Sequence, residues 1–171
     1  RRATGAAKSR LGYMAQKFSL YGLLSGQQNL EFSAGVYGLE GNTRRERIAE
    51  MIETFDLGDW LSATPDSLPL GHKQRLALAC SLMHRPPVLF LDEPTSGVDP
   101  ITRREFWTHI NGLARKAVTI MVTTHFMDEA EYCDRVAMLS RARLIALDTP
   151  DALKRIAANS ERPDPTMEDA F

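Results

Sequence analysis

The stretch VLFLDEPTSGVDP, Val88–Pro100, decides the fold. Its first four residues form a short, continuous apolar run, which is typical of a parallel strand buried on both faces. The run ends at the acidic pair Asp92 and Glu93. Asp99 and Pro100 then supply an N-cap and a first-turn proline, so the sequence predicts a strand, a loop and a helix.

A second apolar run follows this predicted helix. Phe106, Ile110 and Leu113 continue a helical stripe to about Lys116, and VTIMV occupies 118–122. A strand, a helix and a strand within about 35 residues form a βαβ unit, in which the strands are parallel and the crossover is right-handed. The sequence therefore predicts an α/β fold built on a parallel sheet.

The upstream residues predict one more strand and a helical segment. RLGYMA, Arg10–Ala15, predicts a short strand that stops at the polar Gln16. Ser25 and Gln28 have the spacing of a capping box, which predicts a helix over 27–37.

A second capping box, Thr43 and Glu46, predicts the start of another helix. Its apolar residues lie on one helical face, with the spacing i, i+3, i+4 and i+7: Ile48, Met51, Ile52 and Phe55. The segment 27–84 is therefore predicted to be mostly helical.

Downstream, the apolar runs 136–139 and 144–147 predict a hairpin, and Thr149 with Pro150 predicts the start of a short helix. The tail 160–171 contains two prolines and several acidic residues, and it is predicted to be loosely ordered.

Composition narrows the possible classes of protein. With 171 residues, 43% of them hydrophobic, and a net charge of -1, the chain predicts one globular domain without an electrostatic field for nucleic acid. Its two cysteines, Cys80 and Cys133, lack metal-ligand spacing and favour a reducing, cytosolic setting. No stretch reaches the ~20 apolar residues of a membrane helix, so a membrane role requires a partner.

Polar residues end both predicted parallel strands, and ligands of open α/β sheets bind at such carboxyl ends. Asp92 and Glu93 end the first strand, and Thr123, Thr124 and His125 end the second. Neighbouring carboxylates point in different directions, so one can hold a metal ion while the other accepts a proton from water. Taken alone, such an acidic pair is more often a cap and such a histidine an ordinary hydrogen-bonded group.

The string LFLDEPTSGVDP closely resembles the Walker B strand and D-loop of ATP-binding cassette (ABC) proteins. The resemblance implies a P-loop NTPase-type sheet with an inserted helical subdomain. It also implies that Asp92 holds Mg²⁺ through water, that Glu93 is the general base for the hydrolytic water, and that Asp99 lies at a dimer interface.

Two further segments resemble motifs of the same family. TTHFMDEAE, Thr123–Glu131, resembles the switch-histidine segment, which implies that His125 contacts the γ-phosphate of ATP. Gln16 matches the Q-loop glutamine, which implies that it reaches Mg²⁺ and water while the loop after it touches a membrane subunit.

The segment LPLGHKQRLALA, Leu68–Ala79, partly resembles the LSGGQ signature. Pro69 stands at the position of the signature serine, Leu70 at the first glycine, and His72 at the glutamine, whereas Gly71 is retained. A helix N-terminus can still offer N–H groups to phosphate. The resemblance implies that Gly71, His72 and Asp99 take part in nucleotide binding together with Gln16 and Asp92.

Two other stretches look like nucleotide motifs but are rejected. LSGQQ, Leu24–Gln28, lies too far before Asp92, and its Ser25 is already explained as a helix cap. GAAKS, Gly5–Ser9, lacks the glycines of a phosphate loop, and no G-x-x-x-x-G-K-[ST] occurs in the 171 residues. The chain is therefore expected to be a partial ABC ATPase domain, inactive as an isolated fragment.

The pattern resembles the drug-exporter branch of the family, and most of all the second ATPase half of tandem two-cassette subunits. It implies an ATP- and Mg²⁺-dependent ATPase that drives a membrane exporter from the cytoplasmic face, with permease subunits and a second cassette as partners and no nucleic acid. Within residues 1–171, the expected parts are a Q-loop and helical subdomain over 17–85, a catalytic core over 86–159 and the tail over 160–171. The alternatives are a soluble ABC ATPase and a poorly catalytic regulatory cassette.

Overall fold

The computed structural model describes residues 9–17, 19–158 and 163–170. The chain forms two compact units, residues 1–123 and 124–171, and each is described here by itself. This boundary divides the catalytic core that the sequence predicts over 86–159. Four of the five residues of GAAKS, 5–8, lie outside the described residues.

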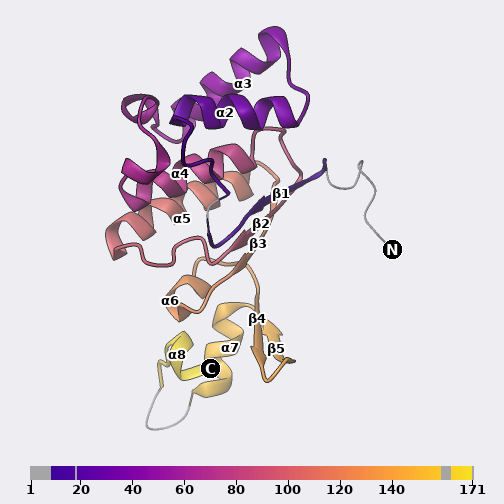
Figure 1. Cartoon of the computed structure of the whole chain (residues 1–171). Helices are drawn as coiled ribbons and strands as arrows, with labels where there is room; N and C mark the ends of the chain where they lie inside the picture. The colour runs from indigo at the N-terminus through magenta and orange to yellow at the C-terminus, as the bar shows by residue number, and fades with distance from the viewer. Residues whose placement is uncertain (1–8, 18, 159–162, 171) are drawn as a thin grey trace. The chain divides into compact units, whose positions relative to one another are not determined.

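The first unit is built on a three-stranded parallel sheet in the order β1-β2-β3 (Figure 1). Its strands are β1 (Leu11–Met14), β2 (Val88–Asp92) and β3 (Thr119–Thr123). β1 and β3 each pair with β2, so that Asp92 at the end of β2 lies beside Thr123 at the end of β3. The predicted parallel βαβ unit is confirmed.

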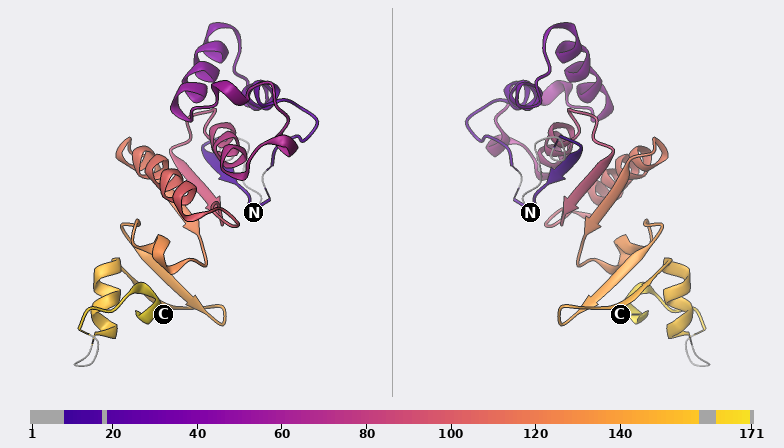
Figure 2. Two further views of the ribbon diagram at one scale, coloured as in Figure 1. Left: turned by 90° about the vertical axis from the view of Figure 1, so that its left-hand side faces the viewer. Right: turned by 90° about the vertical axis from the view of Figure 1, so that its right-hand side faces the viewer.

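Two helices cover one face of this sheet: α4 (Leu70–Ser81) contacts β1, and α5 (Pro100–Arg115) contacts β3. The right-hand view of Figure 2 shows the three strands from the other side. Side chains alternate between the faces, so Leu89 and Leu91 are buried while Tyr13 and Met121 are 58% and 57% exposed. The prediction that the strands are buried on both faces is wrong for the described residues, because their helices pack on one face only.

The helical segment also contains α2 (Gly26–Val36), α3 (Gly41–Thr54) and short 3-10 turns at Gly58–Trp60 and Pro65–Ser67. The capping box of Ser25 and Gln28 is present, as predicted. The predicted box at Thr43 and Glu46 is wrong, because α3 begins earlier. Glu40 has the extended backbone of an N-cap, so Thr43 already lies within the helix.

A buried arginine joins α3 to the C-terminal end of α4. Arg47 donates from Nε to Met83 O at 3.0 Å and from Nη2 to Leu82 O at 2.5 Å, and its Nη1 lies 2.6 Å from Glu50 Oε2. Carbonyls at a helix end have no partner within the helix and attract cations. The hydrogen bond from Arg47 lowers the pKa of Glu50, so the stability that this carboxylate contributes is present at neutral pH and is lost as the pH falls through that lowered pKa.

The second unit contains α6 (Met127–Ala130), the antiparallel strands β4 (Val136–Ser140) and β5 (Arg143–Asp148), α7 (Pro150–Ala157) and α8 (Met167–Ala170). The predicted hairpin and the helix capped by Thr149 are confirmed. The prediction of a loose tail is wrong for residues 163–170, because Met167 is 1% exposed and packs against Ala130, Met138 and Leu153.

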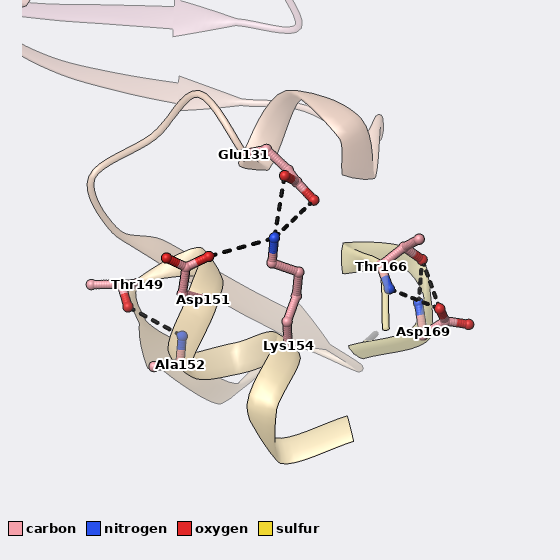
Figure 3. A network of polar contacts seen from close by, with 7 residues as sticks. All are labelled: Glu131, Thr149, Asp151, Ala152, Lys154, Thr166 and Asp169. Atoms are coloured by element: carbon pink, nitrogen blue, oxygen red, sulfur yellow. Dashed lines mark hydrogen bonds and ion pairs between the residues drawn. The ribbon is translucent and has the colours of Figure 1, made fainter. Parts of the chain in front are cut away.

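Polar contacts fix the helices of this second unit (Figure 3). Lys154 on α7 lies 3.3 Å from the carboxylate of Glu131 and 3.5 Å from that of Asp151. Thr166 and Asp169 exchange hydrogen bonds around the first turn of α8. Across the described ranges, every helix is too short or too polar to cross a membrane.

Replacing the buried arginine tests the joint between α3 and α4. Arg47→Met leaves the carbonyls of Leu82 and Met83 without their charged donor, and we expect a loss of about 3 kcal/mol of local stability. Hydrogen exchange of the α4 amides in the full-length protein measures it. The control is Arg45→Met, because among the described residues Arg45 bonds only the exposed Asn42 side chain, and this change should alter stability by less than about 0.5 kcal/mol. Equal exchange in both variants would contradict this role.

Candidate functional site

The carboxyl ends of the three parallel strands hold a cluster of polar side chains. The Thr123 hydroxyl donates to Asp92 Oδ1 at 2.6 Å, and the Tyr13 hydroxyl lies 3.4 Å from Asp92 Oδ2. The Glu93 N–H donates to the Thr123 carbonyl at 2.9 Å. Asp92, Thr123 and Tyr13 share one face of the sheet because paired residues of neighbouring strands point the same way. Asp92 is thus held by hydroxyl groups from both flanking strands.

Gln16 reaches this cluster from the end of β1. Its Nε2 donates to Glu93 Oε2 at 2.7 Å. Glu93 has a left-handed backbone, with φ of 44°, a conformation that costs a residue with a side chain about 1–3 kcal/mol. The turn directs the two neighbouring carboxylates to different partners, Asp92 to the hydroxyls and Glu93 to the amide. The predicted convergence of Gln16, Asp92 and Glu93 is therefore present.

The donor types of this cluster fit a magnesium ion. Mg²⁺ prefers oxygen ligands and is usually bound by one or two carboxylates together with substrate phosphates and water. Asp92 offers a carboxylate, and Gln16 offers an amide oxygen, while no group of three or more His, Cys, Asp or Glu side chains gathers among the described residues. The cluster thus fits an ion that the protein shares with a phosphate ligand.

A second cluster lies at the N-terminal end of α4. A hollow of about 290 Å³ is lined by the first turns of α4 and α5 and the loop before α5: Pro69, Leu70, Gly71, His72, Arg75, Gly97, Val98, Asp99 and Thr102. Pro69 is the N-cap of α4 and makes no side-chain cap. Asp99 caps α5 by accepting from the N–H groups of Ile101 and Thr102, and hydrogen bonds from Thr102 lower the pKa of its carboxyl. Gly71, His72 and Asp99 therefore line one hollow, and their part in nucleotide binding stays a prediction.

Gly71 is required by the close approach of α4 and α5. A Cβ atom at this position would lie 2.4 Å from Thr102 Cγ2, which no real contact tolerates. The Thr102 hydroxyl bonds Asp99, so a rotation of χ1 that moved Cγ2 away would give up that hydrogen bond. The first turn of α4 therefore depends on glycine here.

His72 and Lys73 are both engaged within the helical segment. The ring of His72 lies 4.2 Å from that of Trp60, and burial, followed by the charge of Arg75, lowers the pKa of His72. The imidazole is therefore neutral at neutral pH. Lys73 Nζ lies 3.9 Å from Asp66 Oδ1.

His125 belongs to the second unit, where it is exposed. Its ring lies 4.1 Å from that of Phe126, whose N–H donates to Thr124 Oγ1 at 3.0 Å. The convergence of His125 with Glu93 stays a prediction.

The sequence reasoning missed Tyr13 and the specific bond between Thr123 and Asp92. The available signal was the alternation of side chains along a strand. Tyr13 pairs with Phe90, and Phe90 and Asp92 are two residues apart on β2, so Tyr13 lies on the same face of the sheet as Asp92. This alternation places Tyr13 only when the pairing register of β1 and β2 is known.

Known proteins resemble this chain in sequence and in structure. A profile described as ABC transporter matches residues 2–96, more than half of the chain. The probable multidrug ABC transporter ATP-binding protein YbhF of Escherichia coli (strain K12) is 64% identical over 169 residues, which cover 99% of this chain and 29% of that protein. The daunorubicin resistance ATP-binding protein DrrA2 of Streptomyces coeruleorubidus is 37% identical over 150 residues, which cover 87% of this chain and 47% of that protein.

Among solved structures, cbiO1 from Clostridium perfringens, described as part of the ABC transporter complex cbiONQ, superposes with a TM-score of 0.79 at 27% identity. The superposition covers 86% of this chain and 60% of that one. The fold is that of an ABC ATP-binding domain, within the P-loop NTPase class. The chain belongs to the ABC transporter family, and it spans about a third to a half of the length of the curated relatives it matches.

A double substitution tests the close approach of α4 and α5. Gly71→Ala should cost about 1–3 kcal/mol of stability by forcing its methyl group against Thr102. Adding Thr102→Ser should recover most of the loss, because serine lacks Cγ2 but keeps the hydroxyl that bonds Asp99.

Scanning calorimetry of the full-length protein measures both changes. Gly35→Ala in α2 is the control, since no atom lies within 4 Å of a Cβ there, and it should be neutral or slightly stabilising. Failure of Thr102→Ser to recover stability would refute the steric explanation.

Proposed function

We propose that this chain forms part of the ATP-binding and ATP-hydrolysing subunit of an ABC-type exporter. The proposal rests on the cluster of polar side chains at the ends of the strands. In this cluster the Asp92 carboxylate is held by the Thr123 hydroxyl, and the neighbouring Glu93 carboxylate is held by the Gln16 amide. The relatives named for multidrug transport and daunorubicin resistance support export as the process.

In this proposal, Asp92 and Gln16 hold Mg²⁺ together with the phosphates of ATP. The ion supplies charge neutralisation at the phosphates. Tyr13 and Thr123 orient Asp92 from opposite sides, and their hydroxyls limit the rotation of its carboxylate. The metal ligand is therefore positioned before the nucleotide arrives.

Glu93 accepts the proton of the hydrolytic water in the same proposal. The Gln16 amide donates a hydrogen bond of 2.7 Å to one oxygen of the Glu93 carboxylate and so orients it. The carboxylate can accept a further hydrogen bond from water. His125 completes the site by contacting the γ-phosphate as a hydrogen-bond donor.

We propose that Gly71, His72 and Asp99 act on the nucleotide of a second cassette. They form a cluster of their own around the N-terminus of α4, and a helix N-terminus favours an anion. Each ATP then lies between the strand-end cluster of one cassette and the α4 end of the other. Both halves are needed for turnover.

A permease subunit is the other proposed partner, which puts the chain at the cytoplasmic face of a membrane. The segment after Gln16 supports it: exposed aromatic and aliphatic side chains surround a hollow of about 190 Å³ beside α2, namely Tyr21, Phe32, Val36 and Tyr37. Exposed apolar surface of this kind marks a protein contact. A soluble ABC ATPase remains the alternative, and it would turn over ATP without a permease.

Glu93→Gln in the full-length protein should abolish hydrolysis at this cassette's site while ATP still binds and holds two cassettes closed. The amide keeps the shape of the side chain but removes the base. Steady-state phosphate release and ATP binding, measured with the second site disabled, test this. Glu105→Gln on the exposed side of α5 is the control, and unchanged turnover in Glu93→Gln would remove Glu93 from the role.

The two composite sites should be unequal, with the weaker one completed by the α4 end of this chain. Pro69 offers neither a hydroxyl nor an N–H to phosphate, and Leu70 adds a side chain where close approach favours glycine. The neutral His72 and the engaged Lys73 leave this loss uncompensated. This observation also favours, as a second candidate, a regulatory cassette.

Restoring the signature tests the inequality. Pro69→Ser with Leu70→Gly should raise turnover at the site that they complete by about 10- to 100-fold. A hydrogen bond to a charged group that stabilises the transition state has an effect of this size. Before restoration, Glu93→Gln should remove most activity and the equivalent change in the other cassette little. The reverse ranking would contradict the asymmetry.

A further inference from the structure

A buried glutamine on α4 contacts the turn that carries Glu93. Gln74 is 0% exposed, and its Nε2 donates to the carbonyl oxygen of Pro94, the residue that follows Glu93. Its Oε1 has no hydrogen-bond partner among the described residues. A buried amide oxygen without a partner is unfavourable, whereas an apolar side chain of similar size would avoid that cost. Stability alone therefore gives a weak reason for an amide at this position.

The turn after β2 needs external support. Glu93 has a left-handed backbone, and such a conformation persists only where surrounding contacts hold it. On its N-terminal side, the Glu93 N–H bonds the carbonyl of Thr123 at 2.9 Å. On its C-terminal side, the support comes from Ser96, whose N–H bonds the Glu93 carbonyl at 3.1 Å, and from Gln74. Gln74 is thus the link from α4 to the peptide that aims Glu93.

The same helix end contacts the loop that follows the turn. Leu70 Cδ2 would lie 3.5 Å from a Cβ at Gly97, and Gly71 packs closely on Thr102. Residues 70, 71 and 74 of α4 therefore lie close to the segment 94–102. Because packed interiors resist continuous deformation, a shift of the α4 end is passed to that segment.

We infer that Gln74 is a positioning residue, which couples the α4 end to the orientation of the Glu93 carboxylate. Gln74 is fully buried, and it acts through the Pro94 carbonyl. When a nucleotide of the second cassette binds at the α4 end, the Gln74 amide passes the resulting shift of α4 to the Pro94 carbonyl. The shift aligns the Glu93 carboxylate with Gln16. The inference rests on the proposed function, since it assigns a regulator to the proposed base.

Gln74→Met in the full-length protein tests the inference, because methionine has a similar length but no amide. Displacing a catalytic group by a fraction of an ångström to 1 Å can cost up to 10²-fold, so we expect kcat to fall by about 10- to 100-fold. The affinity for ATP, measured in the Glu93→Gln background, should stay within about twofold. The control is Gln27→Met on α2, where the side-chain amide bonds only Glu31 among the described residues and kcat should not change.

A second readout separates positioning from structural damage. Adding Gln74→Met to Glu93→Gln should lower the residual hydrolysis no further, because a residue that acts through Glu93 has nothing left to position. An additive loss would overturn the inference. So would a large drop in melting temperature in both Gln74→Met and Gln74→Leu, since Gln74 would then serve stability.

The outcomes also distinguish this inference from the proposed function. If the wild-type protein shows no ATP turnover, or if Glu93→Gln leaves turnover unchanged, the proposed function fails. If turnover depends on Glu93 but Gln74→Met keeps the wild-type kcat, only the inference about Gln74 fails.

Discussion

The parallel pairing of β2 with its two neighbours is the constraint on which the rest of the first unit depends. It places the carboxyl ends of three strands side by side, so that Asp92 meets the hydroxyl of Thr123 and Glu93 meets the amide of Gln16. A slip of one residue would turn Asp92 to the helical face, where it would be buried among apolar side chains without these partners. The chemistry of the cluster is therefore inseparable from the register of the sheet.

The helices add a second requirement, which is close contact between the N-terminal ends of α4 and α5. Gly71 permits this contact because any larger side chain would meet Thr102. The contact brings the altered signature segment beside Asp99 in one hollow. At the other end of α4, Arg47 satisfies the final carbonyls and links the helix to α3. The helix is thus fixed at both ends by close contacts, so a displacement at one end is passed to the segments packed against it.

Membership of the ABC transporter family agrees with this arrangement. The arrangement also shows which contacts the departures from the family pattern change. Pro69 and Leu70 alter the α4 end without disturbing the cap of α5 or the packing of Gly71. The ring of His72 lies tilted against that of Trp60 and its pKa is lowered, so it adds no positive charge there at neutral pH. The strand-end cluster, in contrast, has Gln16, Asp92 and Glu93 at the positions of the corresponding family residues. The two clusters of this one chain therefore differ in how completely they match the family.

The sequence by itself determined the parallel α/β core, the helix caps at Ser25, Asp99 and Thr149, and the acidic pair Asp92 and Glu93 at a strand end, because local hydrophobic patterns, caps and strand ends are encoded in short stretches. Only the tertiary structure decided what depends on distant segments. The open face of the sheet, the partnership of Tyr13 with Asp92 and the burial of Gln74 all depend on the register of the strands and on which helices pack where. The anchoring of Met167 was likewise decided by packing, since burial of apolar surface outweighs weak local preferences in a polar tail.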